Sequence, residues 1–320
     1  METPSKEWQL LEKVALASFK EQRRSRRWGI FFKLLTFIYI FAAISVFMVG
    51  KQDMKSVSSD EKHTALVRVH GPIMDEADAS ANMIVGGLRD AFESKNAQAI
   101  ILAINSPGGS PVHAGYVYDE IMRLKALHPN KKVYAVISDL GASAAYYIAA
   151  AADEIYADKA SLVGSIGVIS ASFGFDQVMK TVGVDRRVIT AGTNKAFLDP
   201  YQPAKASDIE FWQQSLNIIH KQFIMQVKNG RGDRLKDSED LFSGLIWSGE
   251  QALDMGLIDG LGSAGYVARD VVGAKDIIDY SVRRDPFETF IKKMGLQAGS
   301  SFAAGMMQQV QASGSAPVLR

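Results

Sequence analysis

The sequence contains no cysteine among its 320 residues, which excludes disulfides, thiol catalysis and zinc sites built on thiolates. Its formal net charge is only +1, so no overall basic field favours nucleic acid as a partner. It also lacks a cluster of histidines or carboxylates at metal-ligand spacing and a glycine-rich phosphate motif. We therefore expect no metal and no cofactor.

One long segment without charged residues predicts a membrane anchor. Residues 34–50 are 17 uncharged positions, and the apolar stretch from Trp28 onward can cross a hydrocarbon core of ~30 Å as a helix. Lys33 lies near one end, where its ammonium can reach the lipid headgroups. Five of the eight residues 20–27 are basic, which places the N-terminus in the cytoplasm and the rest across the membrane. A cleaved signal peptide fits less well, because its apolar core would be unusually long and no Ala-x-Ala site follows.

From residue 63 onward, short apolar strands alternate with helices, the pattern typical of an α/β domain with largely parallel strands. We expect strands at 65–70, 97–104, 132–138 and 154–157, and helices at 78–93, 112–127, 142–151 and 208–229. The apolar stripe of the last helix suits core or subunit packing. The predicted division is a cytoplasmic segment at 1–27, a membrane anchor at 28–50, a linker at 51–62, the folded domain at 63–296 and a disordered tail at 297–320.

Three features of this domain carry groups suited to acyl transfer. Residues 105–109 (NSPGG) close a buried strand, and two glycines allow backbone amides to face a ligand and stabilise an oxyanion. Ser143 opens an apolar helical run, where a nucleophile can be exposed at a helix start. Lys195 can act as its base only when neutral, so burial must lower its pKa by roughly three units. Each feature also has an ordinary explanation: the glycine pair can form a simple turn, Ser143 can serve helix packing, and Lys195 can be a surface lysine.

Other candidate groups are weaker. A Ser-His-Asp triad would need His113, His128 or His220. His113 lies just after the glycine loop, but its neighbours suggest that it solvates a helix start. The tripeptide from Arg231 to Asp233 (RGD) is expected to be a chance match in a solvent-facing loop.

Four ordered motifs resemble the short, single-copy type of signal peptide peptidase A, in serine peptidase family 49 of the Clp/crotonase superfamily. The motifs are NSPGG, GASAAYYIAAAADEIYA, LVGSIGVI and GTNKAFLDP. A later stretch, residues 247–259, also matches, so the resemblance covers about residues 64–275. The predicted N-terminal anchor fits the same group.

This resemblance implies roles for five residues. Ser143 would be the nucleophile and Lys195 the general base, since Ser–Lys pairs are a variant of the serine-nucleophile scheme. The amide of Gly109 would form the oxyanion hole with that of Ala144, and Ser165 would orient the lysine. The chain has Ala-Ala after the nucleophile where many members have Gly-Gly, a change that keeps both amides and bears more on substrate preference than on chemistry.

The function implied is that of a membrane-anchored serine endopeptidase with a crotonase-like α/β domain. Its substrates would be remnant signal peptides and similar membrane-associated peptides, and it would act as a ring-like homo-oligomer. The resemblance places it in the inner membrane of a bacterium, single-pass, with the catalytic domain in the periplasm and lipid contact through residues 28–50. Two alternatives remain open: an acyl-CoA enzyme of crotonase type, and a non-catalytic membrane scaffold with the same fold.

Overall fold

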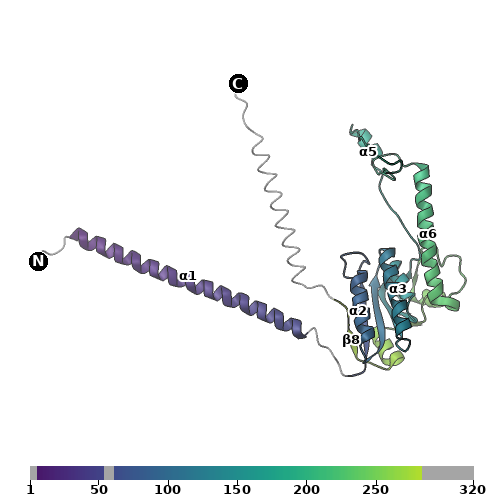
Figure 1. The fold of residues 1–320 in the computed structure, drawn as a ribbon, viewed down its shortest axis with the longest axis horizontal. Helices are drawn as coiled ribbons and strands as arrows, with labels where there is room; N and C mark the ends of the chain where they lie inside the picture. The colour runs from purple at the N-terminus through teal and green to yellow at the C-terminus, as the bar shows by residue number, and fades with distance from the viewer. Residues whose placement is uncertain (1–5, 54–60, 283–320) are drawn as a thin grey trace. The chain divides into compact units, whose positions relative to one another are not determined.

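The computed structural model describes residues 6–53 and 61–282 (Figure 1). The chain divides into two units, residues 1–59 and 60–320. The predicted tail at 297–320 lies outside the described residues, as do residues 54–60 of the predicted linker.

The described residues of the N-terminal unit form one helix, α1 (Lys6–Asp53), of 48 residues. The predicted boundary between cytoplasmic segment and anchor, at residues 27 and 28, lies inside this continuous helix. Trp28, Phe31 and Phe32 form an aromatic cluster on it, each pair of rings having centroids 5.7 Å apart. Side chains beyond Ala42 in α1 are outside the described set, so the predicted anchor is covered only in part. Within the described residues, no helix combines the length and apolar character needed to cross a membrane.

The second unit is built on a mixed sheet of eight strands in which neighbouring strands are parallel, apart from the antiparallel pair β5–β6. The main path runs β6-β5-β3-β2-β1-β8, and β4 pairs with both β3 and β7. The strands are β1 (His63–His70), β2 (Ala97–Ser106), β3 (Val133–Ala142), β4 (Glu154–Ala157), β5 (Leu162–Gly164), β6 (Ile246–Ser248), β7 (Gly260–Leu261) and β8 (Ile277–Asp279). The predicted α/β class with largely parallel pairing is confirmed.

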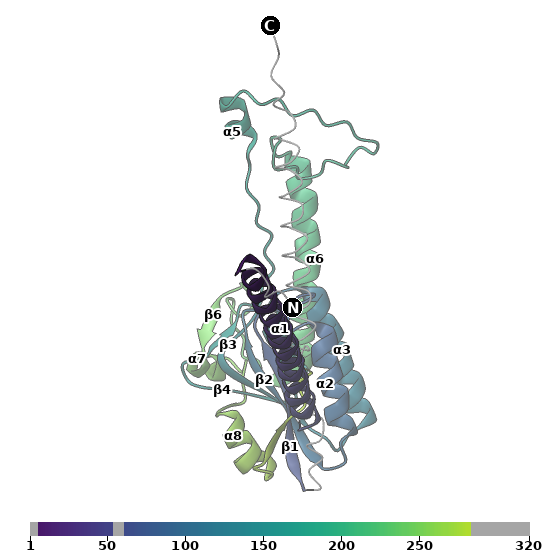
Figure 2. The ribbon, with the colours of Figure 1, turned by 90° about the vertical axis from the view of Figure 1, so that its left-hand side faces the viewer.

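The central strands are apolar on both faces because both faces are covered. Alternate residues enter two different clusters, as the two-residue period of a strand requires. Ile100, Leu102 and Ile104 of β2 pack with the helices α2 (Ala81–Glu93), α3 (Pro111–Leu127) and α4 (Ala144–Ala149). The opposite face packs against the C-terminal segment that contains α8 (Ala264–Tyr266) and the π-helical η2 (Val267–Val272). Figure 2 shows α2 and α3 on one side of the strands and α8 on the other.

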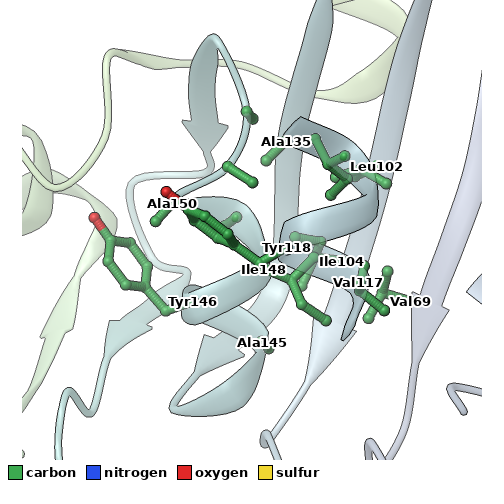
Figure 3. Packing of buried hydrophobic residues seen from close by; sticks show 14 of the residues in the cluster. Val69, Leu102, Ile104, Val117, Tyr118, Ala135, Ala145, Tyr146, Ile148 and Ala150 are labelled. Atoms are coloured by element: carbon green, nitrogen blue, oxygen red, sulfur yellow. The ribbon is translucent and has the colours of Figure 1, made fainter. Parts of the chain in front are cut away.

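Helix α4 is short but firmly held. Five of its residues are buried, and Figure 3 shows Tyr146 and Ile148 within the cluster that also contains Leu102 and Val117. The hydroxyl of Tyr146 donates to the carbonyl oxygen of Leu257 at 2.7 Å. Burial raises the pKa of Tyr146 well above its ordinary value, so this hydroxyl keeps its proton as a donor.

Helix α2 begins three residues later than predicted, at Ala81, with Ser80 in the N-cap position. The side chain of Ser80 makes no capping hydrogen bond. Instead, the Nδ1 atom of His113 on α3 accepts the N–H of Ala81 at 3.1 Å. A tertiary contact therefore supplies the cap, which local sequence signals cannot reveal.

After β5 the chain leaves the sheet, carries α5 (Asp176–Thr181) and returns along α6 (Ala206–Arg231) (Figures 1 and 2). We call residues 169–211 the arm. Several of its apolar side chains are exposed to solvent, among them Ile169, Phe173 and Ile189 at 87%, 80% and 98%. The buried residues of α6 are Phe223, Val227 and Arg231, all in its last third. The predicted long helix is confirmed. Of its apolar stripe, Phe223 is buried, Ile209 is exposed, and the residues between them are half-buried.

The C-terminal end of α6 is fixed by a buried ion pair. The guanidinium of Arg231, 1% exposed, contacts Asp259 at 2.6 Å and donates to the carbonyl oxygen of Gly256. Burial alone would raise the pKa of Asp259, but the hydrogen bond and charge of Arg231 bring it below its usual value. The expectation of a solvent-facing RGD loop is wrong at Arg231, because this arginine belongs to the core.

We expect Asp259→Asn to lower the free energy of unfolding by about 3–5 kcal/mol, because it leaves a buried guanidinium without its counter-charge. Urea unfolding followed by circular dichroism measures this. The matched control is Asp254→Asn on the exposed face of α7 (Gly249–Asp254), for which we expect a change within about 0.5 kcal/mol. Equal effects of the two substitutions would contradict the role of the ion pair.

Candidate active site

The glycine loop after β2 is tied down by hydrogen bonds on both sides. The N–H of Gly108 donates to the Oγ of Ser106 at 3.1 Å, and Ser106 is fully buried. The carbonyl oxygen of Gly108 accepts the N–H of Ile73 at 2.9 Å, and the N–H of Ser110 donates to the carbonyl oxygen of Ile73 at 2.7 Å. The loop that carries Gly109 is therefore rigid before any ligand arrives.

Gly108 is needed because the loop passes very close to the start of α4. A Cβ atom at this position would lie 2.7 Å from the carbonyl oxygen of Ala142, 2.8 Å from the Cβ of Ser143 and 2.9 Å from the nitrogen of Ala144. Such distances are closer than a real Cβ contact permits, and the φ of Gly108 is +95°. The absence of a side chain thus sets the distance between the glycine loop and Ser143.

Ser143 occupies a strained turn between β3 and α4. Its φ and ψ are 54° and −124°, a region that costs a non-glycine residue of order 1–3 kcal/mol. Its N–H donates to the carbonyl oxygen of Gly164 on β5 at 2.8 Å, and its carbonyl oxygen accepts the N–H of Tyr147 at 3.0 Å. These hydrogen bonds to the sheet and the helix stabilise the strained conformation. Ser143 is half-buried and lies directly after the end of β3.

Ser165 occupies a second strained turn directly beside the first. Its φ is 51°, and its N–H donates to the carbonyl oxygen of Leu245 at 2.7 Å. Since Ala142 pairs with Gly164 in the parallel β3–β5 register, the next residues along the two strands are Ser143 and Ser165. The sheet register therefore brings these two serines together.

Four of the five predicted site residues line one pocket of about 520 Å³: Gly109, Ser143, Ala144 and Ser165. Apolar side chains make up much of the remaining wall, namely Pro111, Tyr147, Val168, Ile169, Ile219 and Phe223. Such a combination of a few polar groups in an apolar wall is typical of a ligand site.

Two backbone amides at this pocket have no acceptor of their own. Within residues 61–282, neither the N–H of Gly109 nor that of Ala144 donates a hydrogen bond. Both residues line the pocket together with Ser143. Unpaired amides beside a hydroxyl can bind an oxygen that acquires negative charge.

Lys195 is not brought to this pocket within its own chain. It lies in a turn of the arm, where its N–H donates to the carbonyl oxygen of Gly192 at 3.2 Å, and its side chain is exposed. It is not among the residues that line the pocket.

The three candidate histidines have different surroundings. Because Nδ1 of His113 accepts an N–H, its hydrogen is on Nε2 and that nitrogen offers no lone pair. His128 ends α3 and packs on Phe92, with ring centroids 5.5 Å apart. His220 on α6 contacts the carbonyl oxygen of Ile166, next to Ser165, at 3.0 Å. Of the three, His220 is thus the one that contacts the turn carrying Ser165, and no signal in the sequence indicated this contact.

Known proteins resemble this domain. Peptidase family S49 matches residues 125–277, and the Clp protease family matches residues 53–163. A Na(+)/H(+) antiporter NhaA of Brucella melitensis is 48% identical over 220 residues, 67% of this chain and 30% of that protein. The chloroplastic serine protease SPPA of Arabidopsis thaliana is 32% identical over 200 residues, 62% of this chain and 29% of that protein.

A putative protease of Synechocystis sp. is 30% identical over 206 residues, 64% of this chain and 72% of that protein. The chain belongs to peptidase family S49, and its mixed α/β sheet fits the Clp/crotonase-like domain. It spans only 30% of the length of the Brucella protein, so that protein's name describes a much longer chain.

The strain at Ser143 can be tested without an activity assay. We expect Ser143→Gly to be more stable than Ser143→Ala by about 1 kcal/mol, because glycine relieves a strain of about 1–3 kcal/mol while losing more chain entropy on folding. Urea unfolding of both variants measures the difference. At exposed Ser170, whose φ is not positive, the glycine variant should be the less stable one. The same order at both positions would contradict the strained turn.

Proposed function

We propose that this protein is a serine endopeptidase in which Ser143 attacks a peptide carbonyl and the amides of Gly109 and Ala144 stabilise the oxyanion. The observation that carries the proposal is the placement of Ser143, in a strained turn, beside two unpaired amides in one pocket. Preorganised donors of this kind contribute roughly 3–4 kcal/mol each to transition-state stabilisation. Membership of family S49 supports the same chemistry.

The general base in this proposal is Lys195. In its neutral form it takes the proton from the Ser143 hydroxyl as the oxygen attacks, and it gives that proton to the leaving amine. Water then loses a proton to the same lysine and releases the acyl group from Ser143. Ser165 would hold the amine in line with the nucleophile. The amine needs a water-poor setting to be neutral, which its exposed position in the arm does not supply.

We infer that Lys195 enters the pocket of a second copy of the chain. Lys195 is exposed and away from its own pocket, and the arm that carries it has exposed apolar side chains such as Phe173, Val182 and Ile189. Exposed apolar surface of this kind is typical of a protein interface. An arm laid over a neighbouring pocket would bury both the apolar side chains and the lysine. Repeating this head-to-tail contact closes a ring when the rotation permits.

The substrates proposed are extended peptides with small or apolar side chains, such as remnant signal peptides. The apolar wall formed by Val168, Ile219 and Phe223 favours such side chains over charged ones. An anchor at residues 28–50 would hold the pocket close to the membrane where these peptides remain. The basic residues at 20–27 favour a cytoplasmic N-terminus and a periplasmic catalytic domain at the bacterial inner membrane.

Ser143→Ala and Lys195→Ala should each reduce cleavage of a signal-peptide-like substrate by about a thousandfold or more, since dyad members act as a unit. Lys221→Ala, an exposed lysine on α6, is the matched control and should keep wild-type activity. Activity retained in Lys195→Ala but lost in Ser143→Ala would place the base elsewhere. Wild-type protein that cleaves no peptide but is protected by coenzyme A against thermal unfolding would favour the acyl-CoA alternative.

Mixing the two inactive variants tests whether the dyad forms between copies. Co-expressed Ser143→Ala and Lys195→Ala chains should regain about a quarter of wild-type activity, because random assembly joins an intact serine to a neighbour's intact lysine at that frequency. Mass spectrometry of the mixed oligomers confirms that both chains are present. Mixed oligomers without activity would show that each pocket uses the lysine of its own chain.

A further inference from the structure

His220 links α6 to the wall of the pocket that carries Ser165. Its Nε2 atom lies 3.0 Å from the carbonyl oxygen of Ile166. A carbonyl oxygen can only accept, so Nε2 carries the hydrogen in this contact. The histidine is half-buried, and its neighbour Ile219 lines the pocket.

The turn that receives this hydrogen bond is a strained one. Ser165 has a φ of 51°, and two main-chain hydrogen bonds hold this turn. The N–H of Ser165 donates to the carbonyl oxygen of Leu245 at 2.7 Å, and the N–H of Gly167 donates to the carbonyl oxygen of Ser165 at 2.9 Å. Ile166 itself is fully buried. The other described hydrogen bonds to the backbone of residues 165–167 come from main-chain groups. The bond from His220 differs because its donor is a side chain on α6.

His220 lies at the point along α6 where the helix stops being buried in the domain. The buried residues of the helix, Phe223, Val227 and Arg231, all follow it. His220 is therefore close to the point where α6 leaves the domain and begins to support the arm. Loss of the bond would let the helix and the Ser165 turn move apart and widen the pocket between Ile219 and Gly167, both of which line it.

We propose that His220 is a positioning residue: its Nε2–H holds the Ser165 turn against α6 and so fixes Ser165 relative to Ser143. The inference rests on the proposed peptidase function. It assigns no proton transfer to the imidazole, because the nitrogen that contacts Ile166 is a donor in both charge states of the ring.

Two substitutions separate the hydrogen bond from the imidazole. His220→Gln keeps an N–H donor at similar reach, whereas His220→Leu keeps the approximate volume and loses the donor. We expect His220→Leu to lower kcat about tenfold with a smaller change in KM, and His220→Gln to remain within about threefold of wild type, as the loss of one hydrogen bond implies. The pH dependence of kcat/KM should be the same in wild type and His220→Gln. His128→Leu, at a half-buried histidine away from the pocket, serves as the control and should leave kcat unchanged.

Amide hydrogen exchange provides a readout that does not depend on activity. His220→Leu should speed exchange in residues 165–169 while residues 100–104 of β2 stay protected, and His220→Gln should not. If His220→Gln is as inactive as His220→Leu and loses the acidic limb of the pH profile, the imidazole takes part in proton transfer and the positioning role is overturned. Unchanged exchange and kcat in His220→Leu would overturn it as well.

Failure of the peptidase proposal would look different. Wild-type protein would then neither cleave peptides nor react at Ser143 with a fluorophosphonate probe. The exchange experiment would still decide whether His220 holds the turn, but that link would no longer bear on catalysis.

Discussion

The parallel pairing of β2, β3 and β5 is the constraint on which the site depends. Ser106 pairs with Gly141, and Ala142 pairs with Gly164, so the chain leaves all three strands at the same edge of the sheet. Carboxyl ends of parallel strands are where open α/β sheets place their ligands. Gly109, Ser143 and Ser165 each follow one of these ends. The register therefore brings together three residues that are distant in the chain, and the lack of a side chain at Gly108 allows the glycine loop to approach Ser143 closely.

This dependence explains which features could be predicted from the sequence. The α/β class follows from apolar segments that alternate with helical ones, and local pattern also singled out the glycine loop and Ser143. Ser165 was named only through the resemblance to family 49, because its strand of three residues is too short to recognise in the sequence. The cap of α2 by His113 and the contact of His220 with Ile166 depend on how helices pack. No periodicity in the sequence encodes such contacts, so both were missed or assigned another role.

The arm shows a different limit of prediction. Contacts between residues of the arm include the guanidinium of Arg186, which lies 4.6 Å from the ring centroid of Tyr201 and forms an ion pair with Asp199 at 3.0 Å. They stabilise a local fold without attaching it to the sheet. The position of Lys195 relative to Ser143 is therefore not determined by this chain's core. Under the proposed function, the nucleophile would therefore belong to the sheet domain and the general base to the arm.

The exposed arm has a consequence for when the protein can act. A protease that is active as soon as it is synthesised can cleave other proteins of the same cell. Many proteases are therefore made with an inhibitory segment that is removed later. Under the proposed arrangement, a single newly made copy has an oxyanion site and a nucleophile but no base at hand. Activity would then rise steeply with the local density of copies, so that the number of molecules gathered at one place would decide whether peptides are cut.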